Sequence, residues 1–205
     1  MITRRDTRAA LIDAGRTLFS TLGYEGTSVR ALTGRAGANL GAVTYHFGSK
    51  EALYEAVAES VVAPLRDTIV GVAGLTVPPL ERLEVLVREI LRHLQEHPEL
   101  PRFMIQQIAS DRPVPAMVRE ILQANMAAVV GMIAEGQRLK DIRDGDPRLM
   151  AMSIVAQPIW LAAARRILED AFGLNQGDEH TRFELADSLS RFVRQGLVRE
   201  PQETP

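Results

Sequence analysis

The sequence predicts an all-α protein. We expect an N-terminal three-helix domain with a helix-turn-helix, then a larger helical ligand-binding and dimerisation domain, about nine or ten helices in total. Apolar residues recur at the three- and four-residue intervals of amphipathic helices along most of the chain, and no segment alternates as a half-buried strand does. Residues 27–50 read as two short helices around a glycine turn, a pattern typical of a motif that reads duplex DNA.

The first helix is expected over residues 4–22, where its apolar side supports the elements that follow, and Gly23 ends it. Thr27 and Ser28 have side chains that accept hydrogen bonds from free N–H groups, so they predict the start of the second helix. Gly37 supplies the left-handed backbone conformation of a sharp turn after that helix.

The third helix is expected over residues 40–47, with Asn39 as its cap. A helix this short is unstable alone and must pack on its neighbours. Val43 and Phe47, four residues apart, are the expected inward face. Ser49 then caps the next helix.

The outward face of the third helix suits a DNA groove. Gly41 and Ala42 have little bulk, so the backbone can approach base edges closely. Thr44 offers a hydroxyl group and a methyl group, and a methyl group can contact a thymine methyl.

Cations and aromatic side chains complete the expected DNA contacts. Lys50 lies in the first turn of its helix, where free N–H groups favour a phosphate, and Arg30 can reach a base edge or the backbone. The alternative is that Tyr45, His46 and Phe47 form an aromatic cluster in the core. The residues predicted to bind DNA are Thr27, Ser28, Arg30, Asn39, Leu40, Gly41, Ala42, Thr44, Tyr45, His46 and Lys50.

These residues resemble the DNA-binding domain of the TetR/AcrR family of bacterial transcriptional regulators. The resemblance covers about the first 55 residues and depends on Thr27, Val29, Arg30, Ala36-Gly37, Gly41, Tyr45-His46-Phe47, Ser49-Lys50-Glu51 and Leu53. The chain departs from the usual pattern at Ala38, Asn39 and Thr44, and Thr44 lies on the reading face. The resemblance implies operator DNA as a partner and a small-molecule effector bound among the middle helices.

Charge is distributed unevenly along the chain, whose formal net charge is −2. Residues 1–50 hold seven Lys/Arg and three Asp/Glu, which gives +4, and the remainder holds 17 and 23, which gives −6. Arg4, Arg5 and Arg8 cluster where they can lie along a phosphate backbone. This asymmetry predicts a basic reading head on an acidic body.

The rest of the chain continues as helices separated by glycine and proline. The expected helices cover residues 50–72 with a kink at Pro64, 80–95, 102–109, 114–139, 147–172 with a bend near Pro158, and 183–198. We therefore predict a DNA-binding domain over 1–49, an effector-binding and dimerisation domain over 50–200, and a disordered tail over 201–205.

Two of these segments, residues 147–172 and 181–198, carry more apolar surface than a helix packed on one side needs. We predict that they pair two chains into a homodimer through a four-helix interface, so that two reading heads address half-sites related by a two-fold axis. The alternative is that both helices are central in a monomer core.

The effector-binding residues are expected in the middle helices. Methionine adapts to irregular spaces and therefore suits an apolar pocket, although a methionine or aromatic stripe is more often plain core. The candidates are Phe103, Met104, Gln107, Met126, Gln157 and Trp160.

Other chemistry has little support in the sequence. The chain has no cysteine and no phosphate-binding loop or nucleophile elbow, so we expect no enzyme activity, no catalytic residue and no cofactor. His93 and His97 lie four residues apart on a helix, but no third ligand is evident, and His97 suits the helix dipole. We expect no metal site.

No apolar run reaches the roughly 18 residues of a membrane helix, so we expect a cytoplasmic protein that does not enter a membrane. The sequence thus predicts a repressor that a small, apolar effector releases from a pseudo-palindromic operator. The alternative is a helical ligand-binding or scaffolding protein whose DNA-binding head is degenerate.

Overall fold

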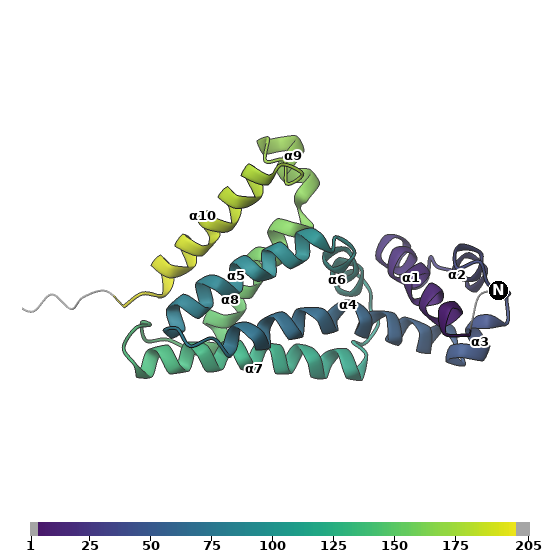
Figure 1. The fold of residues 1–205 in the computed structure, drawn as a ribbon, viewed down its shortest axis with the longest axis horizontal. Coiled ribbons are helices and arrows are strands. Elements are labelled where there is room, and N and C mark those ends of the chain that lie inside the picture. The colour runs from purple at the N-terminus through teal and green to yellow at the C-terminus, as the bar shows by residue number, and fades with distance from the viewer. Residues whose placement is uncertain (1–3, 200–205) are drawn as a thin grey trace, which may run out of the picture. The chain divides into compact units, whose positions relative to one another are not determined.

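The computed structural model describes residues 4–199, except for the side chains of Arg4 and Arg5. Within this range the chain forms ten helices and no β-strand, so the predicted all-α class is confirmed (Figure 1). The helices are α1 (Arg4–Leu22), α2 (Val29–Arg35), α3 (Ala42–Phe47), α4 (Lys50–Ala73), α5 (Pro79–Glu96), α6 (Glu99–Ala109), α7 (Ala116–Arg138), α8 (Pro147–Ala163), α9 (Arg165–Phe172) and α10 (Glu179–Leu197). The predicted tail at 201–205 lies outside the described residues.

The helices group into two compact units. The first comprises residues 1–64 and 98–121, and the second comprises residues 65–97 and 122–205. The predicted division at residue 49 remains a prediction, but α6 packs with the N-terminal helices rather than with its neighbour α5.

In the first unit, α1 contacts α2, α3 and α6. Leu11 and Phe19 of α1, Leu32 of α2, Val43 of α3 and Leu53 of α4 are all buried. Burial of such side chains contributes about 1.5–3 kcal/mol each. This stabilisation offsets the instability of α2 and α3, which are too short to form alone. The helix-turn-helix is therefore held by its packing on α1 and the start of α4.

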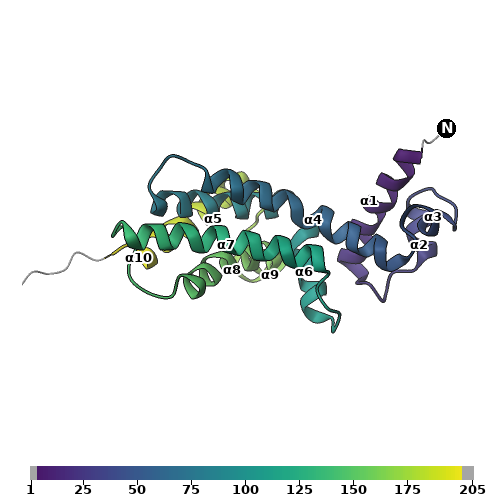
Figure 2. The ribbon, with the colours of Figure 1, turned by 90° about the horizontal axis from the view of Figure 1, so that it is seen from below.

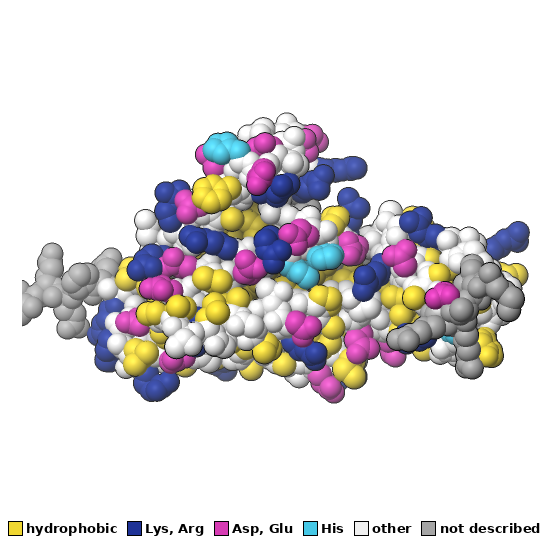
Figure 3. Space-filling model, viewed as in Figure 1, with side chains coloured by type: hydrophobic (Ala, Val, Ile, Leu, Met, Phe, Trp, Pro, Cys, Tyr) yellow, Lys and Arg dark blue, Asp and Glu magenta, His cyan; other side chains and the backbone are white. Residues whose placement is uncertain are grey.

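In the second unit, α5 packs against both α8 and α10 (Figures 1 and 2). Apolar residues line one side of α5, and Leu83, Leu86, Val87, Ile90 and Leu91 are fully buried. Figure 3 shows acidic and basic side chains intermingled on the surface over α5 and α10, where Arg88 and Arg194 pair with Asp187 and Glu84.

Several predicted boundaries need correction. The segment expected as one bent helix over 147–172 divides at Ala164 into α8 and α9, whereas Pro158 lies within α8. The residues before the break, Ala162 and Ala163, are strong helix formers, so local propensity gives no sign of it. The helix expected from residue 102 begins at Glu99.

Helix α7 is long and apolar enough to cross a membrane by length and composition, the one such helix in the part of the chain that the structure describes. Its buried residues Val129, Met132 and Ile133 follow the three- and four-residue spacing of a helix that packs on one side. A helix within the core of a protein passes the same test.

Candidate DNA-binding site

The helix-turn-helix is formed by local signals that act in order along the chain. The Ser28 hydroxyl accepts a hydrogen bond from the Ala31 N–H at 3.1 Å and caps α2. Gly37 has a φ of 63°, in the left-handed region, so it provides the predicted turn. The Ser49 hydroxyl accepts from the Ala52 N–H at 3.1 Å and caps α4, as predicted.

Helix α3 starts two residues later than expected, at Ala42. Gly41 is its N-terminal cap residue, and Asn39 contributes its carbonyl, which accepts from the Ala42 N–H at 3.0 Å. No side chain caps this helix, so the predicted capping role of Asn39 is wrong. The turn closes through backbone hydrogen bonds instead.

The exposed face of α3 agrees with the prediction at most positions. Gly41, Thr44 and Tyr45 are exposed, and Tyr45 keeps 64% of its surface accessible, which rules out the alternative of a buried aromatic cluster for this residue. Leu40, just before the helix, is also exposed. Ala42 is the exception, because it is buried beside Val43 and cannot present its methyl group to a groove.

A hollow of about 540 Å³ opens beside this face. Its lining residues come from α1, the turn and α3: Thr7, Gly37, Ala38, Asn39, Gly41, Ala42, Tyr45 and His46. Polar groups and backbone therefore border an exposed aromatic ring, a surface that can lie along a phosphate backbone while side chains reach base edges.

The N-terminal side of the motif shows one departure from the prediction, at Thr27. Thr27 is fully buried, and its hydroxyl donates to the Gly23 carbonyl at 2.7 Å, so it closes the α1–α2 turn and is inaccessible to DNA. Arg30 is exposed. Of the predicted arginine cluster, Arg8 lies over the Phe47 ring at 5.1 Å, whereas the side chains of Arg4 and Arg5 lie outside the described residues.

Lys50 has an internal role. Its Nζ donates to the Tyr24 carbonyl at 2.6 Å and lies 4.0 Å from the centre of the Tyr24 ring. Burial lowers the pKa of Lys50, and the positive charge of Arg112 acts in the same direction. The ammonium group thus joins the α1–α2 turn to the first turn of α4, and its predicted contact with a phosphate stays a prediction.

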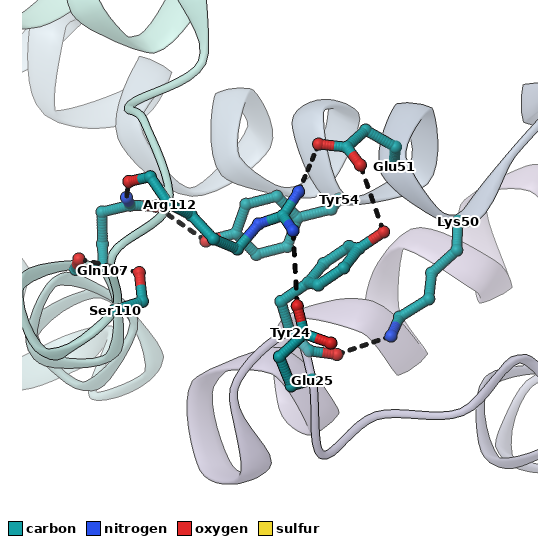
Figure 4. A network of polar contacts seen from close by, with 8 residues as sticks. All are labelled: Tyr24, Glu25, Lys50, Glu51, Tyr54, Gln107, Ser110 and Arg112. Carbon is teal, nitrogen blue, oxygen red and sulfur yellow. Dashed lines mark hydrogen bonds and ion pairs between the residues drawn. The ribbon is translucent and has the colours of Figure 1, made fainter.

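A network around Arg112 makes a second connection to these elements (Figure 4). The guanidinium carbon of Arg112 lies 3.7 Å from the centre of the Tyr24 ring, and the group pairs with Glu25 and Glu51. Burial raises the pKa of Tyr24, with the negative charge of Glu51 adding to it, and burial also raises the pKa of Tyr54. Both phenol groups therefore stay neutral at physiological pH.

Sequence reasoning missed Arg112 because its partners are remote in the chain, with Glu51 and Glu25 lying 61 and 87 positions away. The residues between α6 and α7 carry only turn signals, so no local pattern distinguishes this arginine from others on a solvated surface. Pairs this remote become visible only once the fold brings them together.

The six candidate effector residues are divided between the two units. Phe103 is buried and stacks on Tyr54 at 5.3 Å, and Gln107 accepts from the Tyr54 hydroxyl and donates to the Arg112 carbonyl. These two residues therefore have structural partners within the first unit. Met104 in that unit and Met126 in the other are partly buried.

The remaining two candidates, Gln157 and Trp160, lie on α8. Gln157 donates to the Ser153 carbonyl at 3.2 Å and lines a groove of about 390 Å³ between α8 and α10, whereas Trp160 keeps 57% of its surface exposed. A side chain this exposed does not line an enclosed pocket.

The second unit carries an extended apolar surface on α8, α9 and α10. The large exposed side chains there are Leu149, Met152, Trp160, Ile167, Phe172, Phe183 and Phe192. Phe192 borders the groove between α8 and α10 together with Leu149 and Val193. Exposed apolar side chains that form one large patch are typical of interaction surfaces.

The histidine pair offers two nitrogen ligands at most. The rings of His93 and His97 lie 4.6 Å apart, and over residues 4–199 no group of three or more His, Asp or Glu side chains is arranged to hold a metal ion. A protein zinc site needs at least three ligands.

Comparisons with known proteins agree with this site. Residues 11–57 match the family described as bacterial regulatory proteins, tetR family. The chain is 29% identical over 118 residues to a protein named “Probable HTH-type transcriptional regulator YttP” from Bacillus subtilis, covering 57% of this chain and 56% of that protein. It is 36% identical over 64 residues to the HTH-type transcriptional repressor AcnR of Corynebacterium efficiens, covering 31% of this chain and 34% of AcnR.

The chain thus spans about half, or less, of the length of these two relatives. A longer alignment relates it to the HTH-type transcriptional regulator RutR of Escherichia coli K12, with 23% identity over 93% of this chain and 90% of RutR. The fold is similar to that of AibR in complex with isovaleryl coenzyme A and operator DNA. That comparison has a TM-score of 0.73 and 16% identity and covers 91% of this chain and 97% of AibR.

Proposed function

We propose that this chain, which belongs to the TetR/AcrR family of bacterial transcriptional regulators, is a homodimeric repressor that binds a pseudo-palindromic operator and leaves it when a small molecule binds. The observation that carries the proposal is the exposed face of α3, where Gly41, Thr44 and Tyr45 lie open beside a hollow with polar edges. A cytoplasmic location follows from the proposal, because the bacterial chromosome lies there.

Each group on this face has a proposed role. Thr44 contacts a base edge, Tyr45 contacts a phosphate, and Gly41 lets the backbone approach the duplex. Asn39 and His46 line the hollow beside this face. We assign the exposed residues Ser28, Arg30 and Leu40 to the same DNA contact. Lys50 supports the surface from inside through Tyr24.

The proposed dimer forms through α8 and α10. An operator with two half-sites requires two heads related by a two-fold axis, with the half-sites roughly 34–36 Å apart per DNA turn. The exposed aromatic side chains Trp160, Phe183 and Phe192 supply the anchors that such interfaces favour.

The proposed effector is small and largely apolar, and it carries at least one hydrogen-bond donor. Asn125 of α7 is buried, and its Oδ1 has no hydrogen-bond partner among the described residues. Val129 and Met132 on the same helix are also buried. A buried acceptor without a partner is costly, and a donor group on the effector would satisfy it. The complex of AibR with an acyl-coenzyme A supports an effector with an apolar part.

The alternative function is a helical ligand-binding or scaffolding protein whose head no longer reads DNA. Selection of genomic duplex fragments by the purified protein at near-physiological salt, followed by sequencing, separates the two. The repressor predicts recovery of a pseudo-palindrome whose binding weakens steeply with salt, because neutralised phosphates release counterions. Recovery of no sequence above background, with or without cell extract as a source of effector, would reject the repressor.

A further inference from the structure

We infer that Arg112 is a positioning residue for the DNA-binding head: it fixes both ends of the helix-turn-helix to the segment that follows α6. The inference rests on the proposed DNA-binding function. It adds a residue outside the head and outside residues 11–57, the part that matches the family.

The side chain of Arg112 contacts two separate elements at once. Glu25 lies in the turn before α2, and Glu51 lies in the first turn of α4, so the two carboxylates mark the two ends of the segment that contains α2 and α3. Figure 4 shows the guanidinium group between them, over the Tyr24 ring. One cation therefore sets how far apart these two ends lie.

The backbone of Arg112 is itself held in place. Its carbonyl accepts from Nε2 of Gln107 at 2.9 Å, and Oε1 of the same glutamine accepts from the Tyr54 hydroxyl at 2.8 Å. The Ser110 hydroxyl donates to the Gln107 carbonyl at 3.0 Å. The arginine thus reaches the head from a segment that Gln107 fixes to the end of α6.

The contacts of Arg112 differ in how strongly they hold the two ends together. The Glu25 side chain is 85% exposed, so this ion pair is largely screened by water and salt. The Arg112 side chain is 25% exposed and the Glu51 side chain 55%, so the pair with Glu51 is less screened than the pair with Glu25. The planar group of Arg112 also lies on the face of Tyr24, which favours stacking. These two contacts are the main part of the connection.

The connection reaches the recognition helix through the backbone. Tyr24, which Arg112 covers, also holds Nζ of Lys50 at its carbonyl, and α3 ends at Phe47, three residues before Lys50. Loss of the Arg112 contacts therefore loosens the turn before α2 and the start of α4 together. The exposed face of α3 would then sample more orientations and bind its operator more weakly.

The test uses Arg112→Gln in the full chain, with Arg92→Gln as the matched control. Arg92 is also an arginine paired with two glutamates, Glu89 and Glu96, but it lies on α5 in the other unit. Amide hydrogen exchange is measured on the free proteins, and affinity is measured over a range of salt for a duplex that the wild-type protein selects.

We expect faster exchange at residues 24–26 and 49–52 in Arg112→Gln and no change there in Arg92→Gln. Operator affinity should fall by about tenfold, within the usual range of coupling between sites, with the salt slope unchanged. A slope smaller by about 0.9 would mean that Arg112 contacts a phosphate directly, and it would overturn the inference.

The exchange measurement needs no DNA, so it separates failure of this inference from failure of the proposed function. Unchanged exchange at both segments would overturn the positioning role even if operator binding is observed. In a double-mutant cycle, Arg112→Gln should cost less when Glu51→Gln is already present, because the two residues act through one contact. Strict additivity would contradict the inference.

Discussion

The helix-turn-helix and the α8–α10 region both expose large apolar side chains, but their surroundings differ. Near α3, Leu40 and Tyr45 are exposed, and Tyr45 lines a hollow of about 540 Å³ together with Gly41 and Asn39. Along α8 to α10 the exposed side chains are larger and more numerous, and three phenylalanines and a tryptophan are among them.

The difference indicates two kinds of partner. A surface with small residues, a hydroxyl and a single aromatic ring suits the polar edges of a DNA groove, where contacts to phosphates position the protein and a few side chains read bases. A broad surface with several aromatic anchors suits another protein surface, and the self-complementary choice is a second copy of the chain. Each assignment can be tested by a substitution on one surface that should leave the other intact.

The largest effect is expected from Phe192→Asp. The substitution replaces a ring that is 63% exposed and borders the groove between α8 and α10 with a carboxylate. A charge at the centre of the proposed interface should dissociate the dimer. Affinity for a duplex with two half-sites should fall by about 100-fold, equivalent to roughly 2.7 kcal/mol. Sedimentation equilibrium measures the assembly. The matched control is Ile108→Asp, at an 80% exposed position on α6, and dimers that persist in both variants would refute the proposed interface.

A smaller effect, on DNA alone, is expected from Gly41→Ala. A methyl group at Gly41 would meet only Oδ1 of Asn39 at 3.6 Å, and the φ of −75° is ordinary, so the fold should be unaffected. Operator affinity should fall by about tenfold, about 1.4 kcal/mol, if the backbone approaches the duplex here. Fluorescence anisotropy with the selected duplex measures it. The control is Gly71→Ala on α4, where a methyl group also has free space, and this variant should bind like the wild type. Equal affinities for all three proteins would mean that the duplex does not approach the backbone at Gly41.

Lys50→Met is expected to change the stability of the fold by a free energy similar to the loss of operator affinity in Gly41→Ala. The hydrogen bond from Nζ to the Tyr24 carbonyl is lost, so the free energy of unfolding in urea should fall by about 1 kcal/mol. Arg30→Met, at an exposed position on α2, should leave unfolding unchanged and weaken operator binding instead. The reverse pattern would mean that Lys50 serves mainly as a phosphate contact.

The smallest effect concerns pH and the second unit. The hydrogen bonds from the Arg148 side chain and its N–H lower the pKa of Asp146, the cap of α8, to about 2. A lowered pKa in the folded state means that this stabilisation is fully present above the ordinary value of 3.8 and is lost as the pH falls through about 2. The difference in Tm between wild type and Asp146→Ala should therefore shrink over that window, and operator binding near neutral pH should be equal. A constant difference would contradict the assignment.

The sequence was informative where the signal is local. Ser28, Gly37 and Ser49 each act on atoms within three or four residues, and the structure places all three as predicted. The exposure of Tyr45 and the burial of Val43 also follow from helical spacing in a helix that must pack on its neighbours.

The sequence was uninformative where packing between remote segments decides. Ala42 is buried beside Val43, although the helical spacing had predicted it on the outward face of α3. The break at Ala164 interrupts strong helix formers, and Gln107 is held by Tyr54 and Arg112 rather than left free for an effector. The hydrogen bond between Tyr54 and Gln107 joins residues 53 positions apart, which no local pattern predicts.

Thr44→Ala tests the central claim, that the exposed face of α3 reads DNA, most directly. Binding is measured for wild type and Thr44→Ala on duplexes in which every base pair of the selected half-site is varied in turn. We expect a changed preference at one or two adjacent base pairs in each half-site, by about 1–3 kcal/mol, with the other positions unaffected. An unchanged preference at every position would contradict the claim that this face reads the sequence.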